Sequence, residues 1–369
     1  MSGWENNVRK VVPYTPGEQP KIRNLIKLNT NENPYPPSPK VLEALRSLEG
    51  DALRRYPDPA SSGLVEAIAK RCGVSPECVF AGVGSDDVLA MCFLTFFASG
   101  RPVLFPDITY SFYDVWADLF RIPYETQKLD EEFRIVNRDY FRENGGIIFP
   151  NPNAPTGVLK AKDEIREIVD RNRDVVVIVD EAYIDFARDA EEAASSACLP
   201  AASALPLTGE YENLLVVQTF SKSRSLAGMR IGYAVGNEKL IRFLNDVKYS
   251  FNSYTMNQAA IAAGCAALAD EAYFRECTAK IIRTRERVKK EMAELGFRFR
   301  DSAANFLFVT HPEIPAGKLF AALRQENILV RYFEKPRIDN YLRITIGTEE
   351  EMDALTAFCR KYKASCGMD

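Results

Sequence analysis

The sequence has little histidine and no closely paired cysteines. His311 is the only histidine, so the residues for a Ser/His/Asp mechanism or a histidine-rich metal centre are missing. The cysteines contain no CxxC pair, which is typical of reduced thiols and not of a disulfide framework or a zinc site. They are Cys72, Cys78, Cys92, Cys198, Cys265, Cys277, Cys359 and Cys366. We therefore expect no metal centre.

Basic charge and long apolar runs are also lacking. The formal net charge is −4, which gives no basic surface for a nucleic acid. The apolar segment at 88–100 is too short for a bilayer span and has a helical period, and residues 1–10 lack the apolar core of a signal peptide. We expect a soluble, cytoplasmic protein without nucleic-acid or membrane partners.

The chain is long enough for a large domain and a smaller one, with 369 residues of which 46% are hydrophobic. Residues 1–38 are rich in Pro and Asn and show neither helical nor strand period, which predicts an extended N-terminal arm. Over 39–250, helical patterns alternate with continuous apolar runs, as in parallel strands that helices cover on both faces. This predicts a doubly wound, mostly parallel α/β sheet, followed over 251–369 by a smaller α+β domain.

A polar segment follows each of four apolar runs. These segments are "PDITYSFY" at 106–113, "PNPNAPTG" at 150–157, "DEAY" at 180–183 and "TFSKSRSLAGMR" at 219–230. In open α/β sheets, ligands bind just beyond the carboxyl ends of the strands. We therefore expect the four segments to converge on one site.

The helix start at Gly84 and Ser85 has two interpretations. Ser85 can simply be the N-cap of a core helix, or the backbone amides of Ser85 and Asp86 can bind an anion. In the second case Asp86 would contribute mainly its backbone N–H, because its carboxylate would repel a phosphate.

Asp180 and Lys222 also allow a structural and a functional interpretation. Asp180 ends a buried run, where a carboxylate either caps the next loop or meets a buried cation. Lys222 is either an ordinary solvated lysine or a nucleophile whose pKa is lowered by nearby cations. The hydroxyls of Thr219 and Ser221 and the guanidinium of Arg230 are suited to a phosphate.

Together these groups match the needs of one cofactor. Pyridoxal phosphate needs a Schiff-base lysine, an acid facing its ring nitrogen, donors to its phenolic oxygen and a phosphate site. Lys222, Asp180 and the tyrosine-rich segment that contains Tyr183 offer these groups at strand ends. We expect Gly228 to allow a close backbone approach and Arg224 to lie on the solvated surface.

Eight motifs occur in the order and at the spacings of a known family. They are "LNTNENPYPPSP", "RRYPDP", "GSDD", "TYSFY", "NPNAPTG", "VDEAY", "TFSKSRSLAGMR" and "YLRITIGT". They resemble the pyridoxal-phosphate-dependent aminotransferases of fold type I (class II), and most closely the histidinol-phosphate aminotransferase family. The resemblance implies a large cofactor-binding domain, a small C-terminal domain, the N-terminal arm and a homodimer with shared active sites.

The resemblance also implies roles for cofactor-binding residues. Lys222 would carry the cofactor, Asp180 would pair with the pyridine nitrogen, and Tyr183 would donate to the phenolic oxygen. Tyr110 would stack on the ring. The phosphate would be held by the backbone of Ser85 and Asp86, the side chains of Thr219, Ser221 and Arg230 and, from the neighbouring subunit, Tyr56.

Four residues are assigned to the substrate by the same resemblance. Arg343 would bind the carboxylate of amino-acid substrates, and Arg331 and Tyr14 would help to hold the phosphate of histidinol phosphate. Asn33 would fix the arm over the site.

The sequence departs from the family at two positions. Ala154 stands where an asparagine usually contacts the phenolic oxygen, so Asn153, a water or Tyr183 alone would serve there. Val83 stands where an asparagine is frequent, which would change packing only.

The implied reaction interconverts histidinol phosphate and 2-oxoglutarate with imidazole-acetol phosphate and glutamate, a step of histidine biosynthesis. An aromatic amino-acid aminotransferase and a threonine-phosphate decarboxylase-like enzyme are alternatives on the same scaffold. A ligand-sensing module is a non-enzymatic alternative, but residues 1–38 are too short and not basic enough for a DNA-binding domain.

Overall fold

A seven-stranded sheet lies at the centre of the computed structural model, which describes residues 3–195 and 199–367. Its strands are β2 (Val79–Gly82), β3 (Val103–Pro106), β4 (Tyr124–Gln127), β5 (Gly146–Pro150), β6 (Val177–Asp180), β7 (Leu214–Thr219) and β8 (Gly232–Gly236). Their order is β2-β8-β7-β6-β5-β3-β4. β8 is antiparallel to both of its neighbours and the other neighbouring pairs are parallel. The expected mostly parallel sheet is confirmed.

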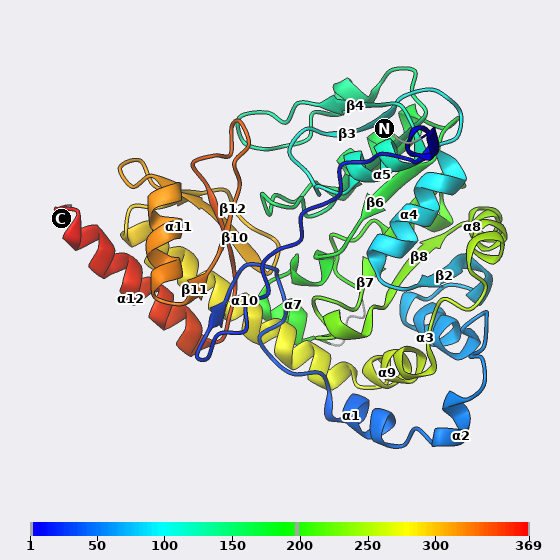
Figure 1. The fold of residues 1–369 in the computed structure, drawn as a ribbon, viewed down its shortest axis with the longest axis horizontal. Helices are drawn as coiled ribbons and strands as arrows, with labels where there is room; N and C mark the ends of the chain where they lie inside the picture. The colour runs from blue at the N-terminus through cyan, green and yellow to red at the C-terminus, as the bar shows by residue number, and fades with distance from the viewer. Residues whose placement is uncertain (1–2, 196–198, 368–369) are drawn as a thin grey trace.

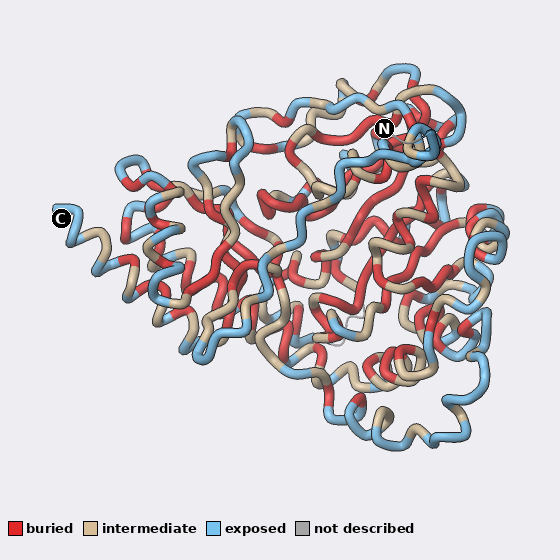
Figure 2. Tube along the Cα trace, viewed as in Figure 1, coloured by how far each residue is buried: buried red, intermediate tan, exposed pale blue. Residues whose placement is uncertain are grey.

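Helices cover both faces of this sheet (Figure 1). The helices before residue 270 are α1 (Pro39–Arg46), α2 (Gly50–Leu53), α3 (Ser62–Cys72), α4 (Ser85–Phe96), α5 (Tyr113–Phe120), α6 (Lys162–Arg171), α7 (Ala190–Ala194), α8 (Glu238–Phe251) and α9 (Gln258–Leu268). Val177 and Val179 of β6 pack with α3, α6 and α9, whereas Ile178 packs with α4, α5 and α8. The alternation follows from the period of two residues in a strand. The apolar runs are therefore buried on both sides (Figure 2).

The C-terminal part forms a second, antiparallel sheet. It contains β9 (Arg298–Phe299), β10 (Phe306–Thr310), β12 (Arg331–Tyr332) and β13 (Leu342–Thr345) in the order β12-β13-β10-β9. The helices α10 (Glu271–Glu294), α11 (Ala316–Gln325) and α12 (Glu349–Ser365) pack against it in a separate apolar cluster. This is the α+β arrangement expected for the tail.

The N-terminal arm contains a short strand that its composition does not predict. β1 (Ile26–Lys27) pairs in parallel with β11 (Ile328–Leu329), so the expectation of an arm without strand structure is wrong at this point. The partner strand lies about three hundred residues away in sequence, and two residues carry no readable period.

The domain limits 1–38, 39–250 and 251–369 stay a proposal. In this division α9 belongs to the smaller part, yet it packs against α1 and α3 in the apolar cluster of the large sheet. The apolar cluster of the large sheet therefore extends to α9, residues 258–268.

His311 is buried and hydrogen-bonded to the backbone, and the described cysteines form no disulfides. The Nδ1 atom of His311 accepts hydrogen bonds from the backbone of Glu313 and Ile314, and the ring is buried. The seven cysteines in the described ranges are free, and Cys198 lies outside them. Within residues 3–195 and 199–367, no helix is long and apolar enough to cross a membrane.

Candidate active site

Residues that follow β3, β5, β6 and β7 line one cavity of about 170 Å³. Pro150, Asp180 and Thr219 are the last residues of β5, β6 and β7. The lining consists of Thr30, Glu32, Ser85, Asp86, Tyr110, Pro150, Ala154, Asp180, Ala182, Tyr183, Thr219, Ser221, Lys222, Ala227 and Arg230. The four polar segments thus meet at the carboxyl ends of the strands.

The amine of Lys222 contacts the N-terminal arm, and the side chain lines the cavity. Its Nζ donates a 3.0 Å hydrogen bond to the carbonyl of Thr30 and lies 5.8 Å from the ring centroid of Tyr183. Burial and the nearby guanidinium of Arg343 lower the pKa of Lys222 to about 8. A substantial fraction of the amine is therefore neutral near pH 8, which makes it a usable nucleophile and base.

Asp180 is a buried carboxylate without a cationic partner among the described residues. It is 4% exposed and accepts hydrogen bonds from the phenol of Tyr113 at 2.9 Å and from the backbone of Ala182 at 3.2 Å. Burial raises the pKa of Asp180 to about 6. A buried anion of this kind is stabilised by a cation, and the protonated ring nitrogen of a pyridine cofactor would supply one.

Arg230 joins the groups at the other end of the cavity. Its Nη1 donates to the Ser221 hydroxyl at 3.3 Å, and the Thr219 hydroxyl donates to the same oxygen at 3.0 Å. Its Nη2 lies 3.0 Å from Oδ2 of Asp86, whose Oδ1 accepts a hydrogen bond from Tyr110. The carboxylate of Asp86 therefore faces the cavity, although we expected mainly its backbone there. Hydroxyls, a guanidinium and the start of α4 together fit a phosphate.

The turn before α4 is shaped around Arg230. Gly84 is the N-cap residue and Ser85 is the first residue of the helix, one position from the expected N-cap. The φ angle of Gly84 is +89°, and a Cβ atom at this position would lie 2.4 Å from Nη2 of Arg230. Only glycine allows both this conformation and the close approach of the guanidinium.

Tyr183 has a partner that the sequence interpretation missed. The side-chain amide of Asn31 donates to the Tyr183 hydroxyl at 3.0 Å, and Asn31 is itself held by Thr345. The sequence analysis gives a role to Asn33 of the same motif and none to Asn31. No local pattern distinguishes the two asparagines, because the contact joins residues 152 positions apart.

Asn153 does not line the cavity, whereas Ala154 does. The two N–H groups of the Asn153 side chain donate to the carbonyl of Ile108 and to the hydroxyl of Thr156. Asn153 therefore has no donor left for a ligand, which argues against it as the substitute for the asparagine missing at position 154.

The expected substrate residues lie on the arm and the second sheet. Arg331 and Arg343 are register partners on β12 and β13, and Arg343 donates to the carbonyl of Asn29 at 3.0 Å. Burial lowers the pKa of Arg343, and its Nε has no hydrogen-bond partner in the described structure. Arg331 lines an adjoining groove of about 670 Å³, and Tyr14 stacks on Phe112 at 4.2 Å.

Asn33 and Tyr56 have different surroundings. The side-chain amide of Asn33 donates to the carbonyls of Lys222 and Ser223, so the arm is tied to the lysine loop. Tyr56 is 80% exposed, its ring centroid lies 4.6 Å from that of Tyr254, and it does not line the cavity.

Two expectations about the lysine loop are wrong. A Cβ atom on Gly228 would meet no atom within 4 Å, so this glycine is not required by a close backbone approach. Arg224 is 7% exposed and pairs with Glu271, so it does not lie on the solvated surface. Its partner is 47 positions away, which a local reading of the basic loop could not show.

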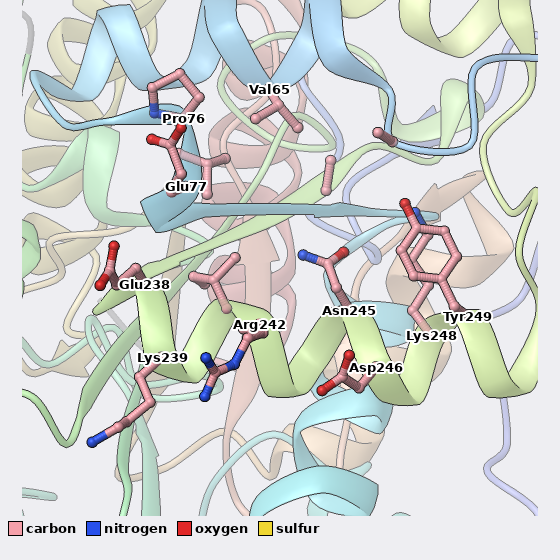
Figure 3. A pocket seen from close by; sticks show the side chains of 14 residues that line it. Val65, Pro76, Glu77, Glu238, Lys239, Arg242, Asn245, Asp246, Lys248 and Tyr249 are labelled. Carbon is pink, nitrogen blue, oxygen red and sulfur yellow. The ribbon is translucent and has the colours of Figure 1, made fainter.

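Another groove lies at the edge of the sheet. This groove has a volume of about 660 Å³ and lies between α3 and α8, beside the edge strand β2 (Figure 3). It is lined by charges of both signs, including Glu77, Glu238, Lys239 and Arg242. Its lining contains none of the site residues that the sequence predicts.

Comparison with known proteins identifies the family of this chain. The family model "Aminotransferase class I and II" matches residues 23–358. A Dechloromonas aromatica protein named histidinol-phosphate aminotransferase 2 is 51% identical over 362 residues, covering 97% of this chain and 98% of the relative. A histidinol-phosphate aminotransferase of Clostridium beijerinckii is 49% identical over 352 residues, covering 95% of both chains.

Solved structures show the same fold. The histidinol-phosphate aminotransferase of Sinorhizobium meliloti, solved in complex with pyridoxal-5'-phosphate, has a TM-score of 0.80 and 26% sequence identity, covering 92% of this chain and 91% of that one. The sequence, the fold-type-I architecture and the cavity at the strand ends lead to one conclusion. This chain belongs to the aminotransferase class I and II family and, within it, to the histidinol-phosphate aminotransferases.

Proposed function

We propose that this protein transfers the amino group of histidinol phosphate to 2-oxoglutarate with pyridoxal phosphate as its cofactor. The observation that carries the proposal is the meeting of Asp180, Lys222 and Arg230 in one cavity. An unpaired buried acid, an amine with a lowered pKa and a phosphate-type cluster are the three groups that this cofactor requires. Family membership supports the same reaction.

The residues of the cavity suit the cofactor in one orientation. Asp180 would face the ring nitrogen, and Tyr110 would lie against the ring. Tyr183, held by Asn31, would donate to the phenolic oxygen. The phosphate would replace the carboxylate of Asp86 beside Arg230, next to Ser221. When bound, the cofactor supplies an aldehyde carbon for Lys222 and a ring that withdraws electrons from the substrate.

Lys222 then serves as the proton carrier. With the cofactor bound, its Nζ would be the group that takes the proton from the substrate carbon bearing the amino group and delivers it to the cofactor's aldehyde carbon. The pKa of about 8 favours this exchange near neutral pH, because the neutral amine accepts a proton and the ammonium releases it readily. Ionised Asp180 would hold the ring nitrogen of the bound cofactor in its protonated form, which supports the ring's electron-withdrawing role.

Arg331, Arg343 and Tyr14 form the proposed substrate end. The unpartnered Nε of Arg343 offers a donor to a carboxylate, and Arg331 offers a guanidinium beside the adjoining groove. The stacked rings of Tyr14 and Phe112 give an aromatic wall suited to an imidazole. Asn33 holds the arm in place through the lysine loop.

Exposed aromatic side chains support a homodimer with shared sites. Tyr56 is 80% exposed and Phe251 is 71% exposed, and Leu53, Tyr249 and Tyr254 are also exposed on α2, the end of α8 and the segments that follow them. Exposed apolar groups gathered over neighbouring elements mark interaction surfaces, and identical chains usually pair by a two-fold axis. In this arrangement Tyr56 would reach the phosphate in the other subunit. The unpaired thiols suit the reducing cytoplasm, the location we propose.

Two other reactions are compatible with the scaffold. The aromatic wall of Tyr14 and Phe112 would also suit phenylalanine, which favours the aromatic aminotransferase as the nearer alternative. A decarboxylase acting on threonine phosphate would release carbon dioxide in place of a keto product.

The deciding experiment compares substrates on the purified holoenzyme. We expect the visible absorption band of the cofactor to shift on addition of histidinol phosphate, with a kcat/KM well above that for phenylalanine. Release of carbon dioxide from threonine phosphate, or a higher kcat/KM for phenylalanine, would exclude the proposed reaction. Lys222→Ala serves as the inactive control.

A further inference from the structure

Two buried arginines lie beside the loop that carries Lys222. Only 5% of the side-chain surface of Arg71 and of Arg224 is exposed. Their guanidinium carbons lie 5.4 Å and 4.1 Å from the ring centroid of Phe274. Two like charges against one buried ring repel each other and have lost water, so they need acids to balance them.

Asp185 and Glu271 supply the two negative charges. Arg71 contacts Asp185 through Nη2 at 3.2 Å and Glu271 through Nε at 3.5 Å. Arg224 contacts Glu271 through Nη2 at 2.5 Å. The hydroxyl of Ser223 donates to the remaining oxygen of Asp185 at 2.6 Å. These five residues form a chain of contacts, the Arg71–Arg224 network, that begins and ends at the two residues immediately after Lys222.

The network ties the lysine loop to other parts of the fold. Asp185 lies two residues after Tyr183, in the short 3₁₀ helix η4 (Ile184–Phe186). It therefore links the segment that contains Tyr183 to the loop that contains Lys222. Arg71 lies near the end of α3 and Glu271 is the first residue of α10. Arg224 also donates to the carbonyl of Ala267 in α9 at 2.7 Å.

Such a network contributes more to geometry than to stability. Buried ion pairs are often neutral or unfavourable for stability relative to apolar residues of similar size, because both charges lose their hydration. Their directional contacts nevertheless fix the groups that they join, and a planar guanidinium with two partners fixes them most tightly. The two partners of Arg224, Glu271 and the carbonyl of Ala267, meet this description.

We propose that the Arg71–Arg224 network positions the amine of Lys222 relative to Tyr183 and the cavity, and that Arg224 and Glu271 are positioning residues for amino transfer. The inference rests on the proposed function in so far as Lys222 carries the chemistry. None of its five residues lines the cavity, so the network acts through the backbone of the lysine loop.

The test is a charge-balanced double variant, Arg224→Met with Glu271→Gln. Removing both partners leaves Arg71 paired with Asp185, so we expect the Tm to stay near that of the wild type. We expect kcat to fall about 10- to 100-fold, because a misplacement of about 1 Å costs up to about 100-fold in rate. KM for histidinol phosphate should change less than about threefold, since the substrate contacts remain. Ser223→Ala, a milder change, should lower kcat in the same direction.

A second readout does not depend on turnover. In the apoenzyme, we expect the pH midpoint of Lys222 labelling by an amine-reactive reagent to shift in the double variant, with faster hydrogen exchange over 220–231. Arg224→Lys keeps the positive charge but loses the planar guanidinium with its two donors. We therefore expect it to change kcat and the labelling midpoint in the same direction as the double variant. Arg287→Met, which removes an ion-paired arginine farther along α10, is the control and should leave both readouts unchanged.

The outcomes separate the two proposals. Wild-type kcat and an unchanged labelling midpoint in the double variant would overturn the positioning role. A wild-type enzyme that does not turn over histidinol phosphate would overturn the proposed function, while the labelling and exchange results would still decide the role of the network.

Discussion

The phenol of Tyr113 donates a 2.9 Å hydrogen bond to Oδ2 of Asp180, and both side chains are buried. Tyr113 is the first residue of α5, and Asp180 is the last residue of β6. This bond lowers the pKa of Asp180, whereas burial, the larger effect, raises it to about 6. Tyr113 thus helps to keep Asp180 ionised at neutral pH.

We predict that Tyr113→Phe lowers kcat about tenfold. A hydrogen bond to a charged group is worth about 1.5–3 kcal/mol, and about 1.4 kcal/mol corresponds to a factor of ten in rate. Without the bond, the pKa of Asp180 rises and the acid limb of the kcat/KM profile moves to higher pH. Tyr140→Phe is the control, because the buried Tyr140 hydroxyl has no hydrogen-bond partner among the described residues. An unmoved acid limb in Tyr113→Phe would contradict the prediction.

The stability of the apoenzyme should carry the signature of Asp180. Its pKa is raised from 3.8 to about 6 in the folded state, so the folded state binds the proton more tightly than the unfolded state. The free energy of unfolding therefore falls as pH rises through this range, by roughly 3 kcal/mol at about 1.4 kcal/mol per pH unit.

Thermal unfolding of the apoenzyme between pH 4 and pH 7 measures this effect. The difference between wild type and Asp180→Asn isolates it, since the other acids titrate in both proteins. A difference in Tm that does not change with pH would show that Asp180 has an ordinary pKa.

Arg343 should tune Lys222 as well as bind substrate. After burial, the positive charge of Arg343 is the largest influence that lowers the pKa of Lys222. Replacement by glutamine removes this charge, so the pKa of Lys222 in Arg343→Gln should rise above about 8. Labelling of Lys222 in the apoenzyme across pH 6–11, followed by mass spectrometry, gives the midpoint.

Glycine at position 84 should be needed for cofactor affinity. In Gly84→Ala, the new methyl group would press on Nη2 of Arg230 and the residue would keep a φ of +89°, so we expect the guanidinium to move. The loss of one charge-assisted contact predicts an affinity for pyridoxal phosphate about tenfold weaker or more. Gly228→Ala, where a Cβ meets open space, is the matched control and should bind within about twofold of wild type. Equal affinities in the two variants would refute this role of Gly84.

Shared active sites predict complementation between inactive subunits. Tyr56→Ala and Lys222→Ala should each be poorly active alone. In a mixed dimer, the Lys222→Ala subunit supplies Tyr56 to the intact Lys222 of the other, so random mixing should restore about a quarter of the sites. Activity after co-refolding, with the mass in solution measured by light scattering, checks the prediction. Sites confined to one subunit would give no recovery.

Much of the candidate site could be predicted from sequence because its residues occupy strand ends. Continuous apolar runs identify parallel strands, and the carboxyl ends of such strands meet by topology. For this reason the sequence alone predicts that Asp180, Thr219 and Lys222 lie close together, as they do in the cavity. The same reasoning could not find Asn31 or Tyr113, because their contacts depend on how the arm and α5 pack.

The amino-acid sequence is sufficient to predict the alternation of helices and strands in the large domain, the edge of the sheet where the polar segments gather, and the family. The burial and pairing of each charged side chain, in contrast, depend on the three-dimensional packing. Arg224 reads as a solvated cation in its own loop, yet α3, α9 and α10 close around it and bring Glu271 within 2.5 Å. Burial and pairing are set by residues far apart in the chain, and it is these long-range contacts that fix the pKa of a side chain and the position of its neighbours.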